Sequence, residues 1–198
     1  MATATRTPLG RALRIWNDIR HALAPDCERL ELAGSARRGR PEVKDLEAVA
    51  IPRFREVPDE NDLYRRPRVA NCLQAHIERM ARMGMIRLVK NGTRYMAFDW
   101  LLDAEPLRVD LFTATVETWP TIYMVRTGPA QFNMMILQRA REKGYRILWG
   151  TGIYNADDVL NDRGRPRPRP GATAIPVASE ADIFALLDMD YIPPEKRE

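Results

Sequence analysis

Two acidic residues at alternate positions of one apolar segment are the first candidates for chemistry. Asp45 and Glu47 lie in residues 44–51, whose small and branched apolar side chains predict a strand. Side chains two positions apart along a strand project from the same face, roughly 7 Å apart along the chain. Both carboxylates can therefore bind a shared hard cation, and two adjacent metals about 3.5–4 Å apart perform in-line phosphoryl transfer.

A third carboxylate normally completes a site of this kind, and Asp110 is the best candidate. In residues 107–112 apolar side chains alternate with polar ones, which predicts a strand with Asp110 inside it. Asp99 and Asp103 are weaker candidates, because they fall at a predicted strand end and in a proline-containing turn. The predicted catalytic and metal-binding residues are therefore Asp45, Glu47 and Asp110.

A glycine-serine turn precedes the acidic strand. Gly34 and Ser35 follow a predicted strand over residues 29–33 and open a predicted anion-binding turn over residues 34–39, in which residues 36–38 suit the first turn of a short helix. The first turn of a helix offers unpaired backbone N–H groups and the positive end of the helix dipole, and glycine allows a ligand to approach the backbone closely. The two arginines that follow add charge-assisted hydrogen bonds to phosphate oxygens. This pattern favours a polyphosphate over a carboxylate as the ligand.

The elements that must position these residues follow from hydrophobic periodicity and turn signals. Asn91-Gly92 is a strong hairpin turn between two apolar segments. Residues 53–68 are dense in proline and charge, so we predict an exposed connection without regular structure there. Helices are predicted over residues 8–23, 69–83 and 129–144, and hairpin strands over residues 85–89 and 95–98.

The charge of the chain is compatible with a polyanionic partner. Its 198 residues carry a formal charge of +4, and the pI is near 9.3. The distribution is more informative than the total, because residues 126–149 contain five basic residues and one acidic residue. Residues 163–170 contain four arginines and no acidic residue.

Cysteine usage and the N-terminus indicate the compartment. The two cysteines are too few for a disulfide framework and lack a zinc-binding Cys-x-x-Cys spacing, which favours a reducing environment. The first eight residues lack the apolar core of a signal peptide, and no segment approaches the roughly 18 apolar residues of a membrane span. We therefore expect a cytoplasmic protein that does not associate with membranes.

The order of these features resembles the nucleotidyltransferase superfamily, and more narrowly DNA polymerase family X. The features are a glycine-serine turn, a strand with two acids and a distant strand with a third acid. Residues 126–133 look like the threonine-glycine turn and asparagine helix of that family. Residues 179–187 and 191–198 are similar to its terminal thumb sequence. The resemblance implies an α+β fold: a nucleotidyltransferase palm with a mixed or antiparallel sheet and flanking helices over residues 1–116, then a small α/β thumb over residues 117–198.

The resemblance also implies roles for individual residues. It implies that Asp45 and Glu47 bind two Mg²⁺ ions, with Mn²⁺ as the alternative, and that Asp110 binds the catalytic ion. In the family, the glycine-serine turn and its second arginine bind the triphosphate, the threonine-glycine turn shapes the sugar pocket, and the helix asparagine touches the incoming base. The implied nucleotide-binding residues are Gly34, Ser35, Arg38, Thr127, Gly128 and Asn133.

Two departures from the family pattern affect this interpretation. Glu47 stands where the best-known members have aspartate, but the longer side chain keeps the charge and the face, so we expect metal binding to survive. The chain begins essentially at the palm, so we expect the N-terminal lyase and fingers region of the family, with its DNA clamps, to be absent. DNA must then be held by the thumb and by basic segments, or be bound weakly.

Two basic segments are predicted to bind nucleic acid. The charges of the first lie near the end of the predicted helix over residues 129–144, where they also complement the helix dipole and need not bind anything. The second alternates proline with arginine and predicts a polyproline-like segment, for which a phosphate-contacting arm and a solvated loop between thumb strands stay equally open. The predicted nucleic-acid-binding residues are Arg139, Arg141, Lys143, Arg163, Arg165, Arg167 and Arg169.

The predicted function is that of a monomeric DNA polymerase that transfers a nucleoside monophosphate from a nucleoside triphosphate to a primer 3′ hydroxyl and releases pyrophosphate. Its expected partners are primer-template or gapped DNA, and its expected role is short gap-filling repair synthesis. One alternative is a nucleotidyltransferase that acts on RNA, protein or a small molecule, against which the thumb-like ending argues. The other is an inactive nucleic-acid-binding module, against which the three intact acids argue.

Overall fold

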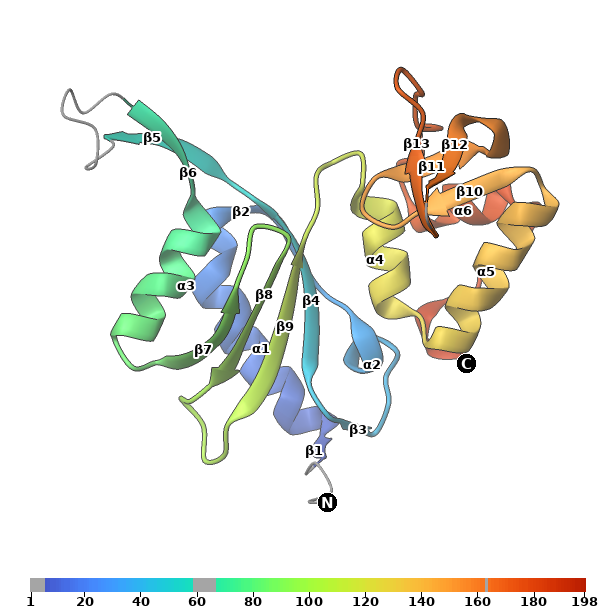
Figure 1. The fold of residues 1–198 in the computed structure, drawn as a ribbon. Helices are drawn as coiled ribbons and strands as arrows, with labels where there is room; N and C mark the ends of the chain where they lie inside the picture. The colour runs from blue at the N-terminus through green and yellow to red at the C-terminus, as the bar shows by residue number, and fades with distance from the viewer. Residues whose placement is uncertain (1–5, 59–66, 163) are drawn as a thin grey trace. The chain divides into compact units, whose positions relative to one another are not determined.

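The chain folds into two compact units, shown as a ribbon in Figure 1. The first unit comprises Met1–Leu32 and Pro41–Thr113, and the second comprises Ala33–Arg40 and Ala114–Glu198. A mixed sheet with helices confirms the predicted α+β class. The structure, a computed structural model, describes residues 6–58, 67–162 and 164–198.

The division into units differs in one respect from the boundary expected after residue 116. The short segment Ala33–Arg40, which the sequence assigns to the palm, clusters with Ala114–Glu198. The chain therefore leaves the first unit after Leu32 and returns to it at Pro41. The functional labels of palm and thumb stay predictions.

A five-stranded mixed sheet forms the centre of the first unit. Its strand order is β2-β4-β9-β8-β7. The central pair β4 and β9 is parallel, and every other neighbouring pair in this sheet is antiparallel. The strands are β2 (Cys27–Leu32), β4 (Leu46–Pro52), β7 (Ile86–Asn91), β8 (Tyr95–Trp100) and β9 (Leu107–Thr113).

Two amphipathic helices bury apolar residues in the core of this unit. The helix α1 (Leu9–Leu23) passes behind the sheet in Figure 1 and buries Ile15, Trp16 and Ile19 on one side. The helix α3 (Cys72–Arg82) buries side chains at helical spacing, and the side chain of its N-cap residue accepts a hydrogen bond from the backbone N–H of Gln74. Hydrophobic periodicity predicted both helices because each has one apolar face.

The short elements of the first unit include one that contradicts the sequence-based prediction. The strand β1 (Thr7–Pro8) pairs with β3 (Glu42–Val43), and the 3-10 helix η1 (Ala24–Asp26) follows α1. The prediction of no regular structure over residues 53–68 was wrong where the chain is described, because β5 (Phe54–Pro58) and β6 (Pro67–Asn71) form an antiparallel ribbon. The rest of that prediction, residues 59–66, lies outside the described residues. Most residues of this ribbon are exposed, so its strands carry no hydrophobic alternation.

The second unit packs helices around its own hydrophobic core. Its helices are α2 (Gly34–Arg37), α4 (Trp119–Thr127), α5 (Ala130–Glu142) and α6 (Glu180–Leu186). A capping box formed by Ser179 and Asp182 begins α6. The core consists of Met124, Phe132, Ile136, Ala140, Ile147, Ile153, Ile183, Phe184 and Leu187.

Two hairpins complete the second unit. The strand β10 (Tyr145–Leu148) pairs with β11 (Gly152–Asn155), and β12 (Val159–Asp162) pairs with β13 (Arg165–Pro168). The polyproline-like interpretation of residues 163–170 was therefore wrong for β13, which is a strand in a two-stranded ribbon. Proline is tolerated there because each strand of such a ribbon has a partner on one side only, and the missing N–H of proline can face the other side. The 3-10 helices η2 (Ala156–Asp158) and η3 (Pro194–Lys196) lie in this unit too.

A helix crosses a membrane only if it is both long and apolar. Within the described residues, each helix is too short or too polar to cross a bilayer.

Candidate functional site

The three predicted carboxylates lie on or beside the central parallel strands of the first unit. Glu47 of β4 and Asp110 of β9 are register partners. Neighbouring strands are about 4.8 Å apart, so these two side chains are adjacent on the same face of the sheet. Both residues are half-buried, whereas Leu46 and Val109 beside them are fully buried.

Asp45 lies just outside the strand that was predicted to contain it. The strand β4 begins at Leu46, and Asp45 occupies the bend before it. The reason is that Val43 pairs with Thr7 of β1 in a separate two-stranded sheet. The chain must therefore bend before it enters the five-stranded sheet.

The electrostatics of Asp45 link it to Asp110. Burial raises the pKa of the half-buried Asp45 carboxyl, and the negative charge of Asp110 raises it further. Lys44 and Arg108 act in the opposite direction. A bound cation between like-charged carboxylates would relieve this repulsion.

The two rejected acids of this unit are held by arginines. Asp99 is 4% exposed and accepts hydrogen bonds from Arg87 and Arg108. Burial alone would raise the pKa of Asp99, but these two arginines outweigh it and hold the pKa below its ordinary value. Asp103 forms an ion pair with Arg11 at 2.9 Å. Their oxygens are thus committed to cations of the chain itself.

The fit of a metal to the predicted carboxylates rests on their chemistry and their placement. Hard divalent ions take oxygen ligands, and all three residues supply carboxylate oxygens. The register of Glu47 with Asp110 and the repulsion between Asp45 and Asp110 bring the three into one neighbourhood. Among residues 6–58, 67–162 and 164–198, however, no three histidine, cysteine or acidic side chains are gathered closely enough to hold an ion as they stand.

The glycine-serine turn belongs to the second unit. Gly34 has φ of +63°, a conformation that favours glycine, and it is the first residue of α2. The N–H groups of Arg37 and Arg38 donate to the carbonyls of Ala33 and Gly34. The preceding N–H groups lie in the first turn of the helix, where no carbonyl of the same helix can accept from them.

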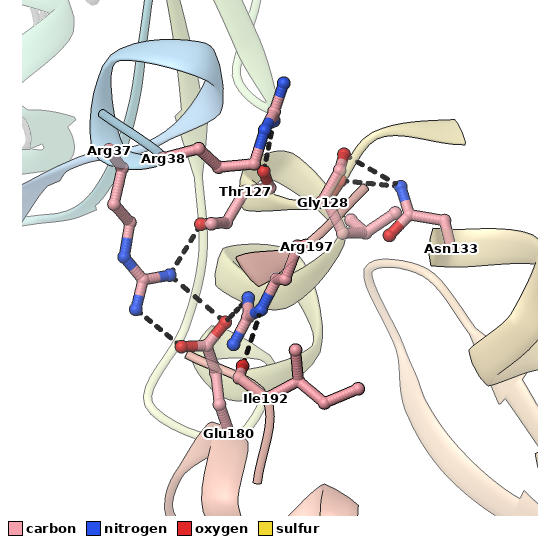
Figure 2. A network of polar contacts seen from close by, with 9 residues as sticks. Arg37, Arg38, Thr127, Gly128, Asn133, Glu180, Ile192 and Arg197 are labelled. Carbon is pink, nitrogen blue, oxygen red and sulfur yellow. Dashed lines mark hydrogen bonds and ion pairs between the residues drawn. The ribbon is translucent and has the colours of Figure 1, made fainter. Parts of the chain in front are cut away.

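The structure brings this turn to the predicted threonine-glycine turn (Figure 2). Arg38 donates to the backbone carbonyl of Thr127, and Arg37 Nη1 donates to Thr127 Oγ1 at 2.5 Å. Gly128 is required by close packing, because a Cβ atom there would lie 2.4 Å from a ring carbon of Phe132. The predicted nucleotide-binding residues before and after α4 are therefore joined within one unit.

Asn133 binds the same turn through its side-chain amide (Figure 2). Its Nδ2 donates to the carbonyls of Val125 at 2.9 Å and Gly128 at 3.3 Å. Its Oδ1 is buried and accepts no hydrogen bond from the described residues. Asn133 thus supports the connection between α4 and α5, and its contact with an incoming base stays a prediction.

A buried ion network that the sequence did not predict lies beside these residues (Figure 2). Glu180, which is 7% exposed, accepts hydrogen bonds from Arg37 Nη2 at 2.5 Å and from Arg197 Nη1 at 2.6 Å. The Arg197 side chain is 0% exposed, and its guanidinium lies 5.0 Å from the ring centroid of Phe132. Burial raises the pKa of Glu180, but the two arginines outweigh it and hold the pKa below its ordinary value.

Sequence patterns gave little indication of this network. Glu180 follows the N-cap of α6, where an acidic residue normally complements the helix dipole. Arg37 and Arg197 are 143 and 17 residues away from Glu180 in the chain. The only available signal was the resemblance of the terminal segment to a family sequence.

Two of the three basic residues predicted at the end of the helix over residues 129–144 make contacts within the second unit. Arg139 Nε donates to the carbonyl of Leu187 at 3.0 Å, and Lys143 forms an ion pair with Asp188. Arg141 is exposed. These contacts favour a structural role for Arg139 and Lys143, and nucleic-acid binding by α5 stays a prediction.

The arginines of the second basic segment lie on and beside β13. Arg165 and Arg167 are exposed on this strand. Arg169 is exposed as well, and its Nε donates to the carbonyl of Asp157 at 2.6 Å. The fourth predicted residue, Arg163, lies outside the described residues.

Comparisons with known proteins agree with the polymerase resemblance. The family described as DNA polymerase beta thumb matches residues 123–198. The DNA polymerase/3′-5′ exonuclease PolX of Bacillus subtilis (strain 168) is 27% identical over 196 residues, which is 98% of this chain and 29% of the relative. A crystal structure of Leishmania infantum polymerase beta, described as a ternary P/T complex, is similar to this chain with a TM-score of 0.75 and 20% sequence identity. The match covers 98% of this chain and 77% of the polymerase beta chain.

These likenesses define the fold of the chain. Its fold is that of polymerase beta, with a mixed sheet and helices. In sequence the chain resembles the family X relative along almost its whole length, and residues 123–198 match the DNA polymerase beta thumb. It spans less than a third of the length of the curated relative it matches.

Proposed function

We propose that this protein is a metal-dependent nucleotidyltransferase that adds nucleoside monophosphates to the 3′ hydroxyl of a DNA primer. One observation carries the proposal: a polymerase-beta-like fold has three half-buried carboxylates at its central parallel strands. The repulsion that raises the pKa of Asp45 supports a cation there. A purely structural sheet has no need of adjacent carboxylates that repel one another.

The proposed roles of the first unit concern metal and hydroxyl. Asp45 and Glu47 would hold two divalent ions, Mg²⁺ or Mn²⁺, and Asp110 would help to hold the catalytic one and lie nearest to the attacking hydroxyl. When bound, these ions supply positive charge that neutralises the phosphates and the charge that develops in the transition state. The task of these carboxylates would be to hold the ions in place, because proteins catalyse phosphoryl transfer mainly by positioning and electrostatic stabilisation.

The proposed roles of the second unit concern the nucleotide. The N–H groups of Gly34 and Ser35 and the guanidinium of Arg38 bind the triphosphate, because they supply donors and positive charge. Thr127 and Gly128 shape the sugar pocket. The base is contacted by Asn133, whose buried Oδ1 accepts no hydrogen bond from the described residues.

The proposed acceptor is a primer-template or a gapped DNA, and short gap filling is the proposed role. The family-X-like fold supports the choice of DNA over other acceptors. The exposed arginines Arg165, Arg167 and Arg169 supply positive charge for phosphate contacts. Arg141 offers a further exposed charge on α5.

Primer extension tests this function. The protein is incubated with a labelled primer, with and without template, with deoxy- or ribonucleoside triphosphates, and with Mg²⁺ or a chelator. We expect extension that requires the metal and is lost in Asp110→Asn. The matched control is Asp157→Asn, which changes an exposed aspartate on η2.

Three results would contradict the proposal. Extension in the presence of chelator would show that the reaction does not depend on a metal. Full activity of Asp110→Asn would show that Asp110 is not part of the site. Labelling of an RNA, protein or small molecule in place of the primer would favour another acceptor. Binding of DNA without transfer to any acceptor would favour an inactive nucleic-acid-binding module.

A further inference from the structure

A tyrosine hydroxyl binds one of the proposed metal ligands. Tyr95 Oη donates to Asp110 Oδ1 at 2.8 Å. The register explains the contact, because Tyr95 of β8 pairs with Phe112 and Asp110 pairs with Ala97. Tyr95 is therefore diagonal to Asp110 across the two antiparallel strands, within the reach of an aromatic side chain.

The ring of Tyr95 contacts side chains of both strands that neighbour β8. It stacks on Phe112, with 4.9 Å between the ring centroids and 19° between the planes. Lys90 of β7 lies over the same ring, with its Nζ 4.9 Å from the centroid. These contacts fix the ring, so the hydroxyl is presented to Asp110 from a defined position.

The hydrogen bond distinguishes the two oxygens of the Asp110 carboxylate. Oδ1 accepts from Tyr95, and Oδ2 is the oxygen that takes no part in this contact. An aspartate side chain without such a contact samples several orientations, because its terminal torsion is broad. The tyrosine therefore restricts how Asp110 presents its second oxygen.

We propose that Tyr95 is a positioning residue that orients Asp110 for binding of a divalent cation. This inference rests on the proposed function, because it assigns Asp110 as a metal ligand. Hydrogen-bond partners of metal ligands typically contribute 10–100-fold to metal affinity or activity. Tyr95 acts only through Asp110 and touches neither nucleotide nor primer in this assignment.

The variant Tyr95→Phe tests the proposal because it removes the hydroxyl and keeps the stacked ring. We expect Mn²⁺ to bind about 10–100-fold more weakly, as measured by electron paramagnetic resonance without nucleotide. The kcat for primer extension should fall by a similar factor, and the KM for the nucleoside triphosphate should stay within about twofold. Circular dichroism checks that the variant is folded.

Two comparisons separate positioning from a general loss of stability. The control Tyr154→Phe removes another hydroxyl hydrogen bond, which Tyr154 donates to the carbonyl of Thr151 at 3.1 Å, and it should leave Mn²⁺ affinity unchanged. In an Asp110→Asn background, Tyr95→Phe should cause no further loss of Mn²⁺ affinity, since its effect passes through Asp110.

Each outcome decides between the two assignments. Wild-type Mn²⁺ affinity and kcat in Tyr95→Phe would overturn the positioning role and leave the proposed function standing. Weaker Mn²⁺ binding in Tyr95→Phe, together with no nucleotidyl transfer by the wild-type protein, would support the positioning role and contradict the function. A wild-type protein that binds no Mn²⁺ would overturn the positioning role, as would an equal further loss in the Asp110→Asn background.

Discussion

The variant Glu180→Gln should substantially destabilise the second unit. It keeps the size of a buried side chain but removes the charge that binds both Arg37 and Arg197. The Arg197 side chain is 0% exposed, so its guanidinium cannot turn to solvent when the carboxylate is replaced. Arg197 Nη2 already has no hydrogen-bond partner in the described part of the chain, which leaves little alternative pairing.

The expected magnitude follows from the burial of the pair. Removal of one partner from a buried ion pair typically costs about 3–5 kcal/mol, because the other charge is left uncompensated. Glutamine can still accept a hydrogen bond from Arg197 or Arg37, so we expect a loss near the lower limit, about 3 kcal/mol at pH 7. The control Glu105→Gln breaks an exposed pair with Arg11 and should cause no measurable loss.

The pH dependence gives a second test of the same variant. The pKa of Glu180 is lowered in the folded state, from an ordinary value of 4.5. The unfolded chain therefore takes up a proton first, and the stabilisation by Glu180 is fully present above the unfolded pKa and is lost as pH falls through the folded pKa. The difference between wild type and Glu180→Gln should be constant from pH 7 to about pH 5 and shrink below about pH 4.

The measurement is urea unfolding combined with hydrogen exchange resolved by peptide. Exchange in α6 reports the second unit directly, whereas total fluorescence mixes both units, since Trp16 and Trp119 belong to different ones. A loss below about 1 kcal/mol at pH 7 would refute the reasoning, since that is the range of an exposed pair. A difference that does not shrink in acid would show that charge is not its cause.

Two further predictions concern the substrates. Replacement of the arginines of residues 165–169 by glutamine should weaken DNA binding. The slope of log K against log salt concentration should become shallower by up to about 0.9 for each phosphate that these arginines neutralise. An unchanged slope would show that this ribbon is solvated and does not contact DNA. Sugar discrimination should be relaxed, because a half-buried branched aliphatic residue, Val125, and an exposed arginine, Arg126, precede the turn at Thr127 and leave more space for a ribose 2′ hydroxyl than bulky aromatic residues would. Steady-state kinetics on one primer-template would measure it, and a deoxy preference of a thousandfold or more, about 4 kcal/mol, would contradict it.

Elements with one apolar face were predictable from the sequence. The helix α1 and the hairpin of β7 and β8 appear where periodicity and Asn91-Gly92 indicated them, within a few residues. The ribbons of β5 with β6 and of β12 with β13 were missed, because exposed two-stranded ribbons are held by backbone hydrogen bonds and carry no apolar pattern. Proline in both ribbons strengthened the wrong interpretation.

The placement of Glu47 and Asp110 within strands was predictable for the same physical reason. Glu47 and Asp110 are polar residues between buried ones in strands, and such alternation is visible in a single segment. The environment of Asp110 could not be predicted from the sequence. Its contact with Tyr95, 15 residues away in the chain, depends on the register of β8 with β9. The bend that removes Asp45 from its strand depends on a pairing with Thr7.

The two consecutive arginines of the glycine-serine turn show what the long-range contacts add. From sequence alone, Arg37 and Arg38 are equivalent cations at the start of a short helix, and only the family resemblance favours the second for phosphate binding. In the structure Arg37 binds Glu180 with both terminal nitrogens and lies over the ring of Tyr123, 3.8 Å from its centroid. Its charge is therefore balanced by a buried carboxylate. Arg38 donates to the backbone carbonyl of Thr127. An anion at this turn would have to compete with Glu180 for Arg37, which is a physical reason to assign Arg37 to the stability of the second unit and not to the triphosphate.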